Sequence, residues 1–185
     1  MRNIPAYIIV ALLLLTGAGP ALLGCKKKDT PPDNAEFLKR QAKYKVIDDS
    51  VIRAYLVRNK FEPNSYVKTA EGVYVVTLSS NPQGKPAAVG KLVALKYEGR
   101  LISKAQENYI FDSTYTGRSL CECMQYPVGS PEYIEGWRVG VSLLRMGDHK
   151  LLLIPSYLAY GAIGKGTIPP DTPLLFDMVI VSVSQ

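Results

Sequence analysis

Hydrophobic residues are spaced in three ways along the chain, and each spacing predicts a different element. Residues 4–15 are almost entirely apolar. Between residues 35 and 59, apolar residues recur near helical spacing without Gly or Pro, which predicts one or two amphipathic helices. Four runs rich in β-branched, leucine and aromatic residues are predicted strands, namely 73–79, 92–101, 151–154 and 174–183. The predicted helical stripe consists of Phe37, Leu38, Tyr44, Ile47, Val51, Ile52, Tyr55 and Leu56.

Turn-forming residues separate these elements and define the expected organisation. Residues 136–144 can form a helix of about two turns between the second and third predicted strands. Short strands with one short helix predict an α+β domain over residues 72–185. A helical accessory segment, 35–71, is expected before it, and we expect its apolar stripe to pack on that domain or on a second copy of the chain rather than on lipid.

The first 24 residues have the layout of a secretory signal peptide. Arg2 precedes an apolar run that is too short to span a bilayer well, and Gly and Pro end it. The sequence Leu22-Leu23-Gly24-Cys25 resembles a bacterial lipobox. That resemblance implies cleavage before Cys25, acylation of the cysteine with fatty acids such as palmitate, and a lipid-anchored linker over 25–34. It places the protein in the cell envelope, at the outer membrane, and the alternatives are an uncleaved anchor or an ordinary signal peptide.

The positive charge is concentrated beside this proposed anchor. Residues 26–60 hold ten Lys or Arg against five Asp or Glu, whereas residues 61–185 hold eleven of each. The run Lys26–Lys28 would lie near anionic lipid head groups, or it would form a solvated tether. The basic residues are not interleaved with stacking aromatics, so nucleic acid is not an expected partner.

The residues that usually carry metal or nucleophilic chemistry are scarce. His149 is the single histidine, follows Gly147-Asp148 and is expected in an exposed turn, so no Ser/His/Asp set can be argued. Cys121 and Cys123 would share one face of a strand, and a bond between them would be strained. There is no second cysteine pair, so neither a metal nor a cofactor is expected.

The strongest functional signal is a series of short motifs in the carboxy-terminal half. They are Phe111-Asp112-Ser113, Ile134-Glu135-Gly136-Trp137, Ala159-Tyr160-Gly161, Ile168-Pro169-Pro170 and Phe176-Asp177. In order and approximate spacing they resemble the FKBP-type peptidyl-prolyl cis-trans isomerases, from about Gly90 to Gln185. The resemblance implies an antiparallel sheet wrapped around a short helix, with the ligand between them.

The same resemblance implies a role for each of ten residues. Trp137 would be the floor beneath a proline ring, Tyr160 and the Ile134 N–H would be donors, and Asp112 would lie near the twisting carbonyl. The alternatives are a plain core role for Trp137 and a turn cap for Asp112. The remaining implied wall and rim residues are Tyr97, Phe111, Met124 (or Cys123 in its place), Tyr133, Ile168 and Phe176.

Two functions remain open at this point. Rotation about an X-Pro bond crosses a barrier of about 18–20 kcal/mol and needs no nucleophile, metal or cofactor. The first function is therefore isomerisation of proline-containing clients among exported proteins. The second is a non-catalytic binding or assembly module that reuses the fold. Relatives with such helices before the domain also imply a homodimer through them.

Overall fold

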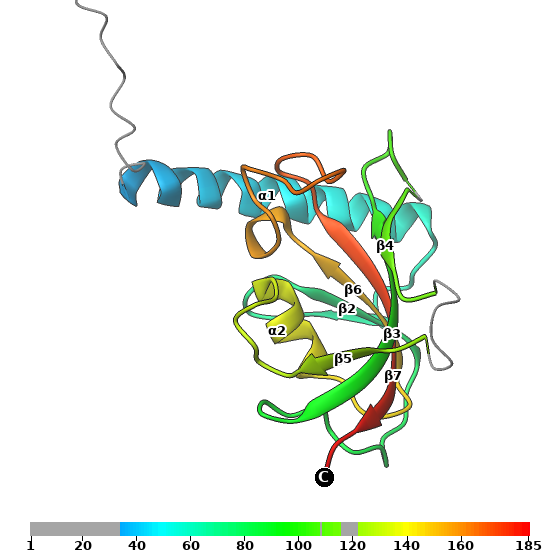
Figure 1. The fold of residues 1–185 in the computed structure, drawn as a ribbon. Coiled ribbons are helices and arrows are strands. Elements are labelled where there is room, and N and C mark those ends of the chain that lie inside the picture. Colours follow the sequence, from blue (N-terminus) through cyan, green and yellow to red (C-terminus); the bar gives the residue numbers. More distant parts are fainter. Residues whose placement is uncertain (1–33, 108, 116–121) are drawn as a thin grey trace, which may run out of the picture. The chain divides into compact units, whose positions relative to one another are not determined.

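The computed structural model describes residues 34–107, 109–115 and 122–185 (Figure 1). The proposed signal peptide, Cys25 and residues 26–33 of the linker lie outside the described residues. Predictions about cleavage, lipidation and the basic tether therefore stay predictions.

The described residues form two α-helices, one 3₁₀ helix and seven strands. Their bounds are α1 Asn34–Arg58, β1 Tyr66–Lys68, β2 Tyr74–Ser79, β3 Leu92–Leu101, β4 Ile110–Ser113, β5 Met124–Pro127, α2 Glu135–Val141, β6 His149–Ile154, η1 Ser156–Leu158 and β7 Leu174–Val183. The four predicted strands and both predicted helical regions are present, and β3 and β7 have the predicted bounds. The strands β1, β4 and β5 were not predicted, because they have three or four residues each and are too short for a clear alternation.

All pairings in the sheet are antiparallel, in the order β1-β2-β6-β7-β3-β4. The outer edge of β3 is shared: residues 98–100 pair with β4, and residues 92–95 pair with β5. β4 and β5 therefore occupy different stretches of the same edge of β3. This is the expected α+β fold, with a sheet curved around α2 (Figure 1).

Each face of the sheet carries its own hydrophobic core. Along β6, Leu152 and Ile154 pack in the cluster that contains α2, while Leu151 and Leu153 pack in the cluster that contains α1. Successive side chains of a strand point to opposite faces, so a continuous apolar run is what a sheet covered on both sides requires. Figure 1 accordingly shows α1 and α2 on opposite sides of β2 and β6.

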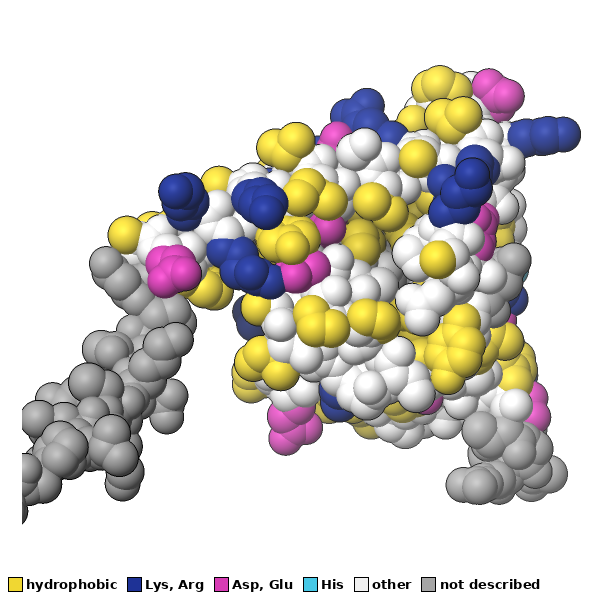
Figure 2. Space-filling model, turned by 90° about the horizontal axis from the view of Figure 1, so that it is seen from above, with side chains coloured by type: hydrophobic (Ala, Val, Ile, Leu, Met, Phe, Trp, Pro, Cys, Tyr) yellow, Lys and Arg dark blue, Asp and Glu magenta, His cyan; other side chains and the backbone are white. Residues whose placement is uncertain are grey.

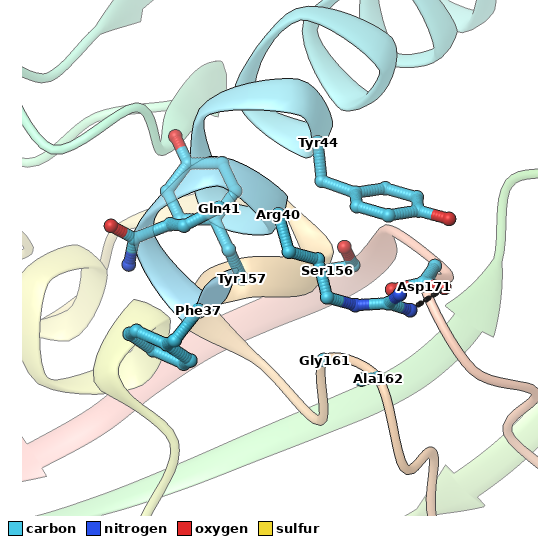
Figure 3. Close-up of a pocket in the computed structure, with 9 residues that line it drawn as sticks. All are labelled: Phe37, Arg40, Gln41, Tyr44, Ser156, Tyr157, Gly161, Ala162 and Asp171. Atoms are coloured by element: carbon cyan, nitrogen blue, oxygen red, sulfur yellow. Dashed lines mark hydrogen bonds and ion pairs between the residues drawn. The ribbon is translucent and has the colours of Figure 1, made fainter. Parts of the chain in front are cut away.

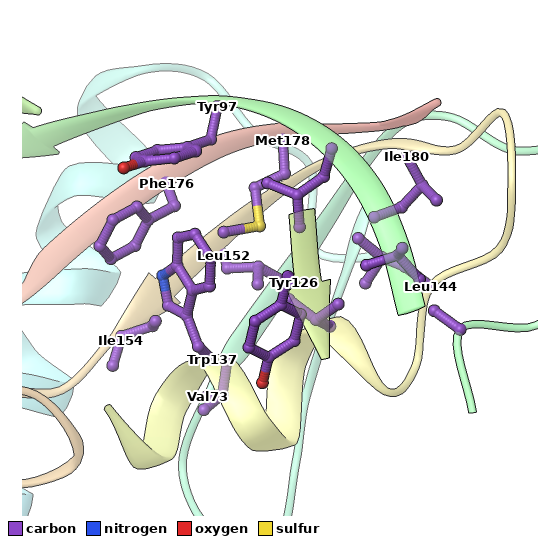
Figure 4. Packing of buried hydrophobic residues seen from close by; sticks show 14 of the residues in the cluster. Val73, Tyr97, Tyr126, Trp137, Leu144, Leu152, Ile154, Phe176, Met178 and Ile180 are labelled. Carbon is purple, nitrogen blue, oxygen red and sulfur yellow. The ribbon is translucent and has the colours of Figure 1, made fainter. Parts of the chain in front are cut away.

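Helix α2 lies close to the sheet because two glycines face it. A Cβ atom at Gly136 would lie 2.2 Å from Ile154 Cγ2, and one at Gly140 would lie 2.5 Å from Leu152 Cδ1. The intervening Trp137 is buried between the helix and the strands (Figure 4). The two glycines thus fix the depth at which the indole ring sits.

Helix α1 packs on the opposite face only through its carboxy-terminal half. Ile52, Tyr55 and Leu56 are buried in the second cluster. Phe37 and Leu38, which belong to the predicted stripe, are 53% and 55% exposed because the first turns of α1 extend beyond the strands. Figure 2 shows hydrophobic side chains next to Lys and Arg on this face.

His149 was expected in an exposed turn, but the structure places it in a strand. It is the first residue of β6, half-buried, and its Nε2 lies 2.6 Å from Asp177 Oδ1 on β7. The turn of Gly147-Asp148 ends one residue earlier than the sequence suggested.

In the described part of the chain, no helix is long and apolar enough to cross a bilayer.

If α1 belongs to the folded domain, truncating its buried side chains should destabilise the whole domain. Ile52 is 0% exposed, so Ile52→Ala should lower the free energy of unfolding by about 2–5 kcal/mol. Val57, on the same helix, is 76% exposed, and Val57→Ala should change it by about 0.5 kcal/mol or less. Urea unfolding of both variants measures this, and equal small effects would show that α1 is a separate appendage.

Candidate active site

A cavity of about 210 Å³ opens between α2, the β3–β4 edge and the loop after β6. Its lining residues are Tyr97, Phe111, Asp112, Met124, Glu132, Tyr133, Ile134, Trp137, Tyr160, Lys165 and Phe176. Nine of the ten residues that the sequence singled out are among them. The exception is Ile168, and Glu132 and Lys165 were not foreseen as site residues.

Trp137 forms the floor of this cavity and is also part of the core. Its ring meets Tyr97 and Phe176 edge-on, with centroid distances of 5.0 and 5.2 Å (Figure 4). Such T-shaped pairs fix ring orientation as well as burying area. Its Nε1 is buried and has no hydrogen-bond partner among the described residues. The two roles considered for Trp137 are therefore compatible.

A β-bulge directs two consecutive residues of β4 into the same cavity. In the β3–β4 register, Gly99 faces Asp112 and Arg100 faces Ile110, so Phe111 is the extra residue. Neighbouring strand residues normally point to opposite faces, and a bulge re-aims one of them. Gly99 makes room for the ring, since a Cβ there would lie 2.6 Å from Phe111 Cζ.

Asp112 is held in place by two hydrogen bonds. The Tyr97 hydroxyl donates to Oδ2 at 2.6 Å, and the Ser113 N–H donates to Oδ1 at 2.9 Å. Burial, followed by the hydrogen bond to Asp112, raises the pKa of Tyr97 above its ordinary value. The carboxylate lines the cavity and also accepts from the N–H of the next residue, so this geometry is compatible with both roles considered for Asp112.

Two residues that line the cavity, Ile134 and Tyr160, each carry a donor with no protein acceptor in the described part of the chain. Ile134 precedes α2 with φ −58° and ψ 147°, and its carbonyl accepts from the Trp137 and Arg138 N–H groups. Its own N–H donates to none of the described residues. The Tyr160 hydroxyl is likewise unpaired, and burial raises its pKa, so it stays a donor.

The lining of the cavity also includes an aromatic ring, Tyr133, and two charged residues, Glu132 and Lys165. Tyr133 stacks on Trp137 at a centroid distance of 5.7 Å and an interplanar angle of 10°. Lys165 Nζ lies 5.2 Å from the centre of the Tyr160 ring, and at this distance the electron-rich face of the ring attracts the positively charged ammonium group. Glu132 precedes Tyr133 on the rim, and its position next to a predicted site residue was the available signal for it.

Ile168 was expected at the edge of the pocket and is instead buried in the core beneath the loop. Its backbone exchanges two hydrogen bonds with Lys165, at 2.9 and 3.0 Å. This short bridge brings the Lys165 side chain to the edge and turns Ile168 inward. Because the bridge is a backbone feature, residue types alone did not reveal it.

The wall position left open between Cys123 and Met124 is taken by Met124. Cys123 is disulfide-bonded, and Cys121 lies outside the described residues. Among residues 34–107, 109–115 and 122–185, no group of three or more His, Cys, Asp or Glu side chains is placed to hold a metal ion.

Comparison with known proteins identifies the family. The profile of the FKBP-type peptidyl-prolyl cis-trans isomerase family matches residues 83–181, and this chain belongs to that family. Peptidyl-prolyl cis-trans isomerase FKBP53 of Arabidopsis thaliana is 38% identical over 65% of this chain and 24% of its own length. FK506-binding protein 2 of Debaryomyces hansenii is 31% identical over 62% of this chain and 82% of its own length.

The first curated relatives are much longer proteins, and this chain spans only 7–24% of their lengths. Among solved structures, a peptidyl-prolyl cis-trans isomerase of Pseudomonas syringae pv. tomato is 29% identical, with a TM-score of 0.57, covering 75% of this chain and 95% of that one. FkpA of Escherichia coli has a TM-score of 0.60 at 23% identity, over 81% of this chain and 65% of that one, which shows a shared fold.

Because the Phe111 ring lies close to Gly99, adding a side chain at position 99 should change the shape of the cavity wall. Gly99→Ala should displace the Phe111 ring and weaken binding of a proline-containing peptide by about three- to tenfold. Titrations followed by fluorescence of Trp137, the only tryptophan, measure the affinity.

In a Phe111→Ala background the same glycine substitution should have little further effect, because the ring that it displaces is absent. Equal losses in both backgrounds would contradict this account of the wall.

Proposed function

We propose that this protein is a peptidyl-prolyl cis-trans isomerase that accelerates rotation about X-Pro bonds in exported proteins. The observation that carries the proposal is one cavity whose lining combines the Trp137 floor, the Asp112 carboxylate that accepts from Tyr97, and two donors that have no protein acceptor among the described residues. Membership of the family supports the reaction class.

The reaction requires a weakening of amide resonance, which holds the X-Pro bond planar. A proline ring seated on Trp137 would be surrounded by the aromatic side chains of Tyr97, Phe111 and Phe176. Such a surrounding excludes water and makes each polar contact stronger than in bulk solvent. The Ile134 N–H and the Tyr160 hydroxyl would then stabilise the twisted bond more than the planar one, which is what lowers a barrier.

No step of this mechanism uses a covalent intermediate. The Tyr97 hydroxyl keeps its proton at neutral pH, since burial raises its pKa, and it fixes the direction of the Asp112 carboxylate. Asp112 would act through its charge near the twisting carbonyl. The proposed reaction is therefore metal-free and independent of a cofactor.

One observation favours a second function, a catalytically weak binding or assembly module. Tyr133 lies parallel to Trp137 and, together with Glu132 and Lys165, makes the entrance narrower and more charged than a purely apolar rim. A module of this kind would bind proline-containing segments without accelerating their isomerisation. The activity assay below distinguishes the two functions.

We further propose that the protein works at a membrane surface of the cell envelope, through acylation of Cys25. The lipobox-like sequence and the adjacent run Lys26–Lys28 support this location. Exported polypeptides that contain proline would be its clients, and slow prolyl isomerisation is the folding step that it would accelerate. Pairing of two copies through the amino-terminal helices fits the exposed Phe37 and Leu38.

Substitutions of Asp112 and of Trp137 should affect kcat and peptide affinity differently. Asp112→Asn keeps the shape and removes the charge, so it should lower kcat by about two- to tenfold and change peptide affinity less. Trp137→Leu should weaken both, because it leaves a gap beneath the ring. Glu62→Gln, an exposed change away from the cavity, is the control.

NMR exchange on an Ala-Leu-Pro-Phe peptide measures the rate. Since burial raises the pKa of both Tyr97 and Tyr160, their hydroxyls stay protonated, and the rate should be constant from about pH 7 to 9. A wild-type protein that binds the peptide without accelerating exchange would be a binding module. Loss of the rate in EDTA would refute the metal-free mechanism.

The proposed anchor predicts a change in membrane association. Cys25→Ser removes the acylated thiol and should release the protein from the membrane fraction, with Glu62→Gln, an exposed change, as the control variant that stays bound. Fractionation followed by immunoblotting of both variants measures this. Retention of Cys25→Ser in the membrane would refute lipidation and favour an uncleaved anchor.

A further inference from the structure

A buried carboxylate on α1 lies against the loop that carries Tyr160. The Tyr160 loop, Ser156–Asp171, begins with η1 and lies between β6 and β7. Asp48 is 0% exposed, and its Oδ2 accepts hydrogen bonds from Ser156 N at 2.8 Å and Ser156 Oγ at 2.7 Å. Its other oxygen, Oδ1, is buried and has no partner in the described residues.

A second contact ties the other end of the same loop to the same helix. Arg40, two turns before Asp48, forms an ion pair with Asp171 at 2.5 Å (Figure 3). Asp171 adopts a left-handed backbone conformation with φ 55°, which is uncommon for a residue other than glycine. Helix α1 therefore holds both ends of the loop.

The loop behaves as one hydrogen-bonded unit between these ends. The Ser156 carbonyl accepts from Ala159 and Gly161, and the Gly161 carbonyl accepts from Asp171 N at 2.7 Å. The Tyr160 carbonyl accepts from Gly164. A shift at Ser156 or Asp171 would be passed through these bonds to Tyr160, whose hydroxyl is one of the two donors of the site.

Apolar packing does not explain these contacts. Between α1 and the loop there is a cavity of about 100 Å³, with Phe37 and Tyr44 on the helix side and Tyr157 and Ala162 on the loop side (Figure 3). Burial raises the pKa of Asp48 to about 6, against the effect of its Ser156 hydrogen bonds, so the ionised form is costly at this position. If this contact only buried surface between the helix and the loop, a neutral side chain would do so without the cost of removing a charge from water.

We propose that α1 is a positioning element of the isomerase site, in which Asp48 and Arg40 fix the Tyr160 loop and thereby the place of the Tyr160 hydroxyl. This inference rests on the proposed isomerase function and gives α1 a part in it. Residues 34–58 lie outside the segment that the family profile matches, 83–181, so the positioning residues are an addition to the part that defines the family.

A double-mutant cycle tests the coupling, because no hydrogen bond or ion pair joins Asp48 directly to Tyr160 and the loop is the proposed connection between them. In the wild type, Tyr160→Phe should lower kcat/KM by about two- to tenfold, the effect of one hydrogen bond. Asp48→Ala and Arg40→Met should each lower kcat/KM, with KM changed less than kcat. In the Asp48→Ala background, Tyr160→Phe should cost less than about twofold, since the hydroxyl is already misplaced.

The same helix offers matched controls. Asp49, the next residue, binds Lys68, Tyr74 and Arg53 rather than the loop. Asp49→Ala and Arg53→Met should therefore leave the full effect of Tyr160→Phe in place, even where they lower stability. Asp48→Asn keeps an acceptor for Ser156 and should restore most of the activity that Asp48→Ala loses. All rates are measured well below the unfolding midpoint of the least stable variant.

Hydrogen exchange provides a measurement that does not depend on activity. In Arg40→Met and Asp48→Ala, the amides of Gly161, Gly164 and Asp171 should exchange faster, while those of β6 and β7 keep their protection. A wild type without isomerase activity would refute the proposed function, and the exchange data would still decide whether α1 fixes the loop.

If Asp48→Ala does not fold, Arg40→Met and Asp48→Asn carry the same comparisons. The proposal is overturned if the losses from Asp48→Ala or Arg40→Met are additive with that from Tyr160→Phe. It is also overturned if exchange in the Tyr160 loop is unchanged in the folded variants.

Discussion

The strict alternation of side chains along the central strands is the constraint on which the rest of the structure depends. On β7, Leu174 and Phe176 enter the core beside α2, while Leu175 between them enters the core beside α1. A shift of one residue in the register would exchange the two faces. This one register therefore determines where α2 and Trp137 pack on one face of the sheet and where α1 packs on the other.

The active-site geometry arises where this regular pattern is interrupted. The bulge at Phe111 turns two consecutive residues toward one cavity, and Gly99 accepts the ring that results. The edge of β3 is divided between β4 and β5, and both short strands supply lining residues, Phe111 and Asp112 from β4 and Met124 from β5. Pairs of aromatic rings then hold Trp137 in place, and its indole nitrogen has no hydrogen-bond partner among the residues that the structure describes. The regular sheet supplies rigidity, and its irregularities supply the site.

Helix α1 links the part of the chain outside the family match to that site. Its carboxy-terminal half is part of a hydrophobic core, whereas its polar contacts reach the Tyr160 loop across a small cavity. Apolar contact thus anchors the helix, and directional hydrogen bonds and one ion pair define its relation to the loop. Because hydrogen bonds are more sensitive to geometry than apolar contacts, they are suited to fixing the position of one hydroxyl group.

The sequence by itself determined the fold class, the long strands β3 and β7, the helices and nine of the residues around the cavity. Their signals are local: periodicity over ten residues, or short motifs in a fixed order. Only the tertiary structure decided that Ile168 turns inward while Lys165 takes the rim, that Phe111 and Asp112 face the same way, and that His149 lies in a strand beside Asp177. It also brought Asp48 and Ser156, 108 positions apart, into one hydrogen-bonded pair. These features depend on register, bulges and contacts between distant segments, and no local pattern of residue types encodes them.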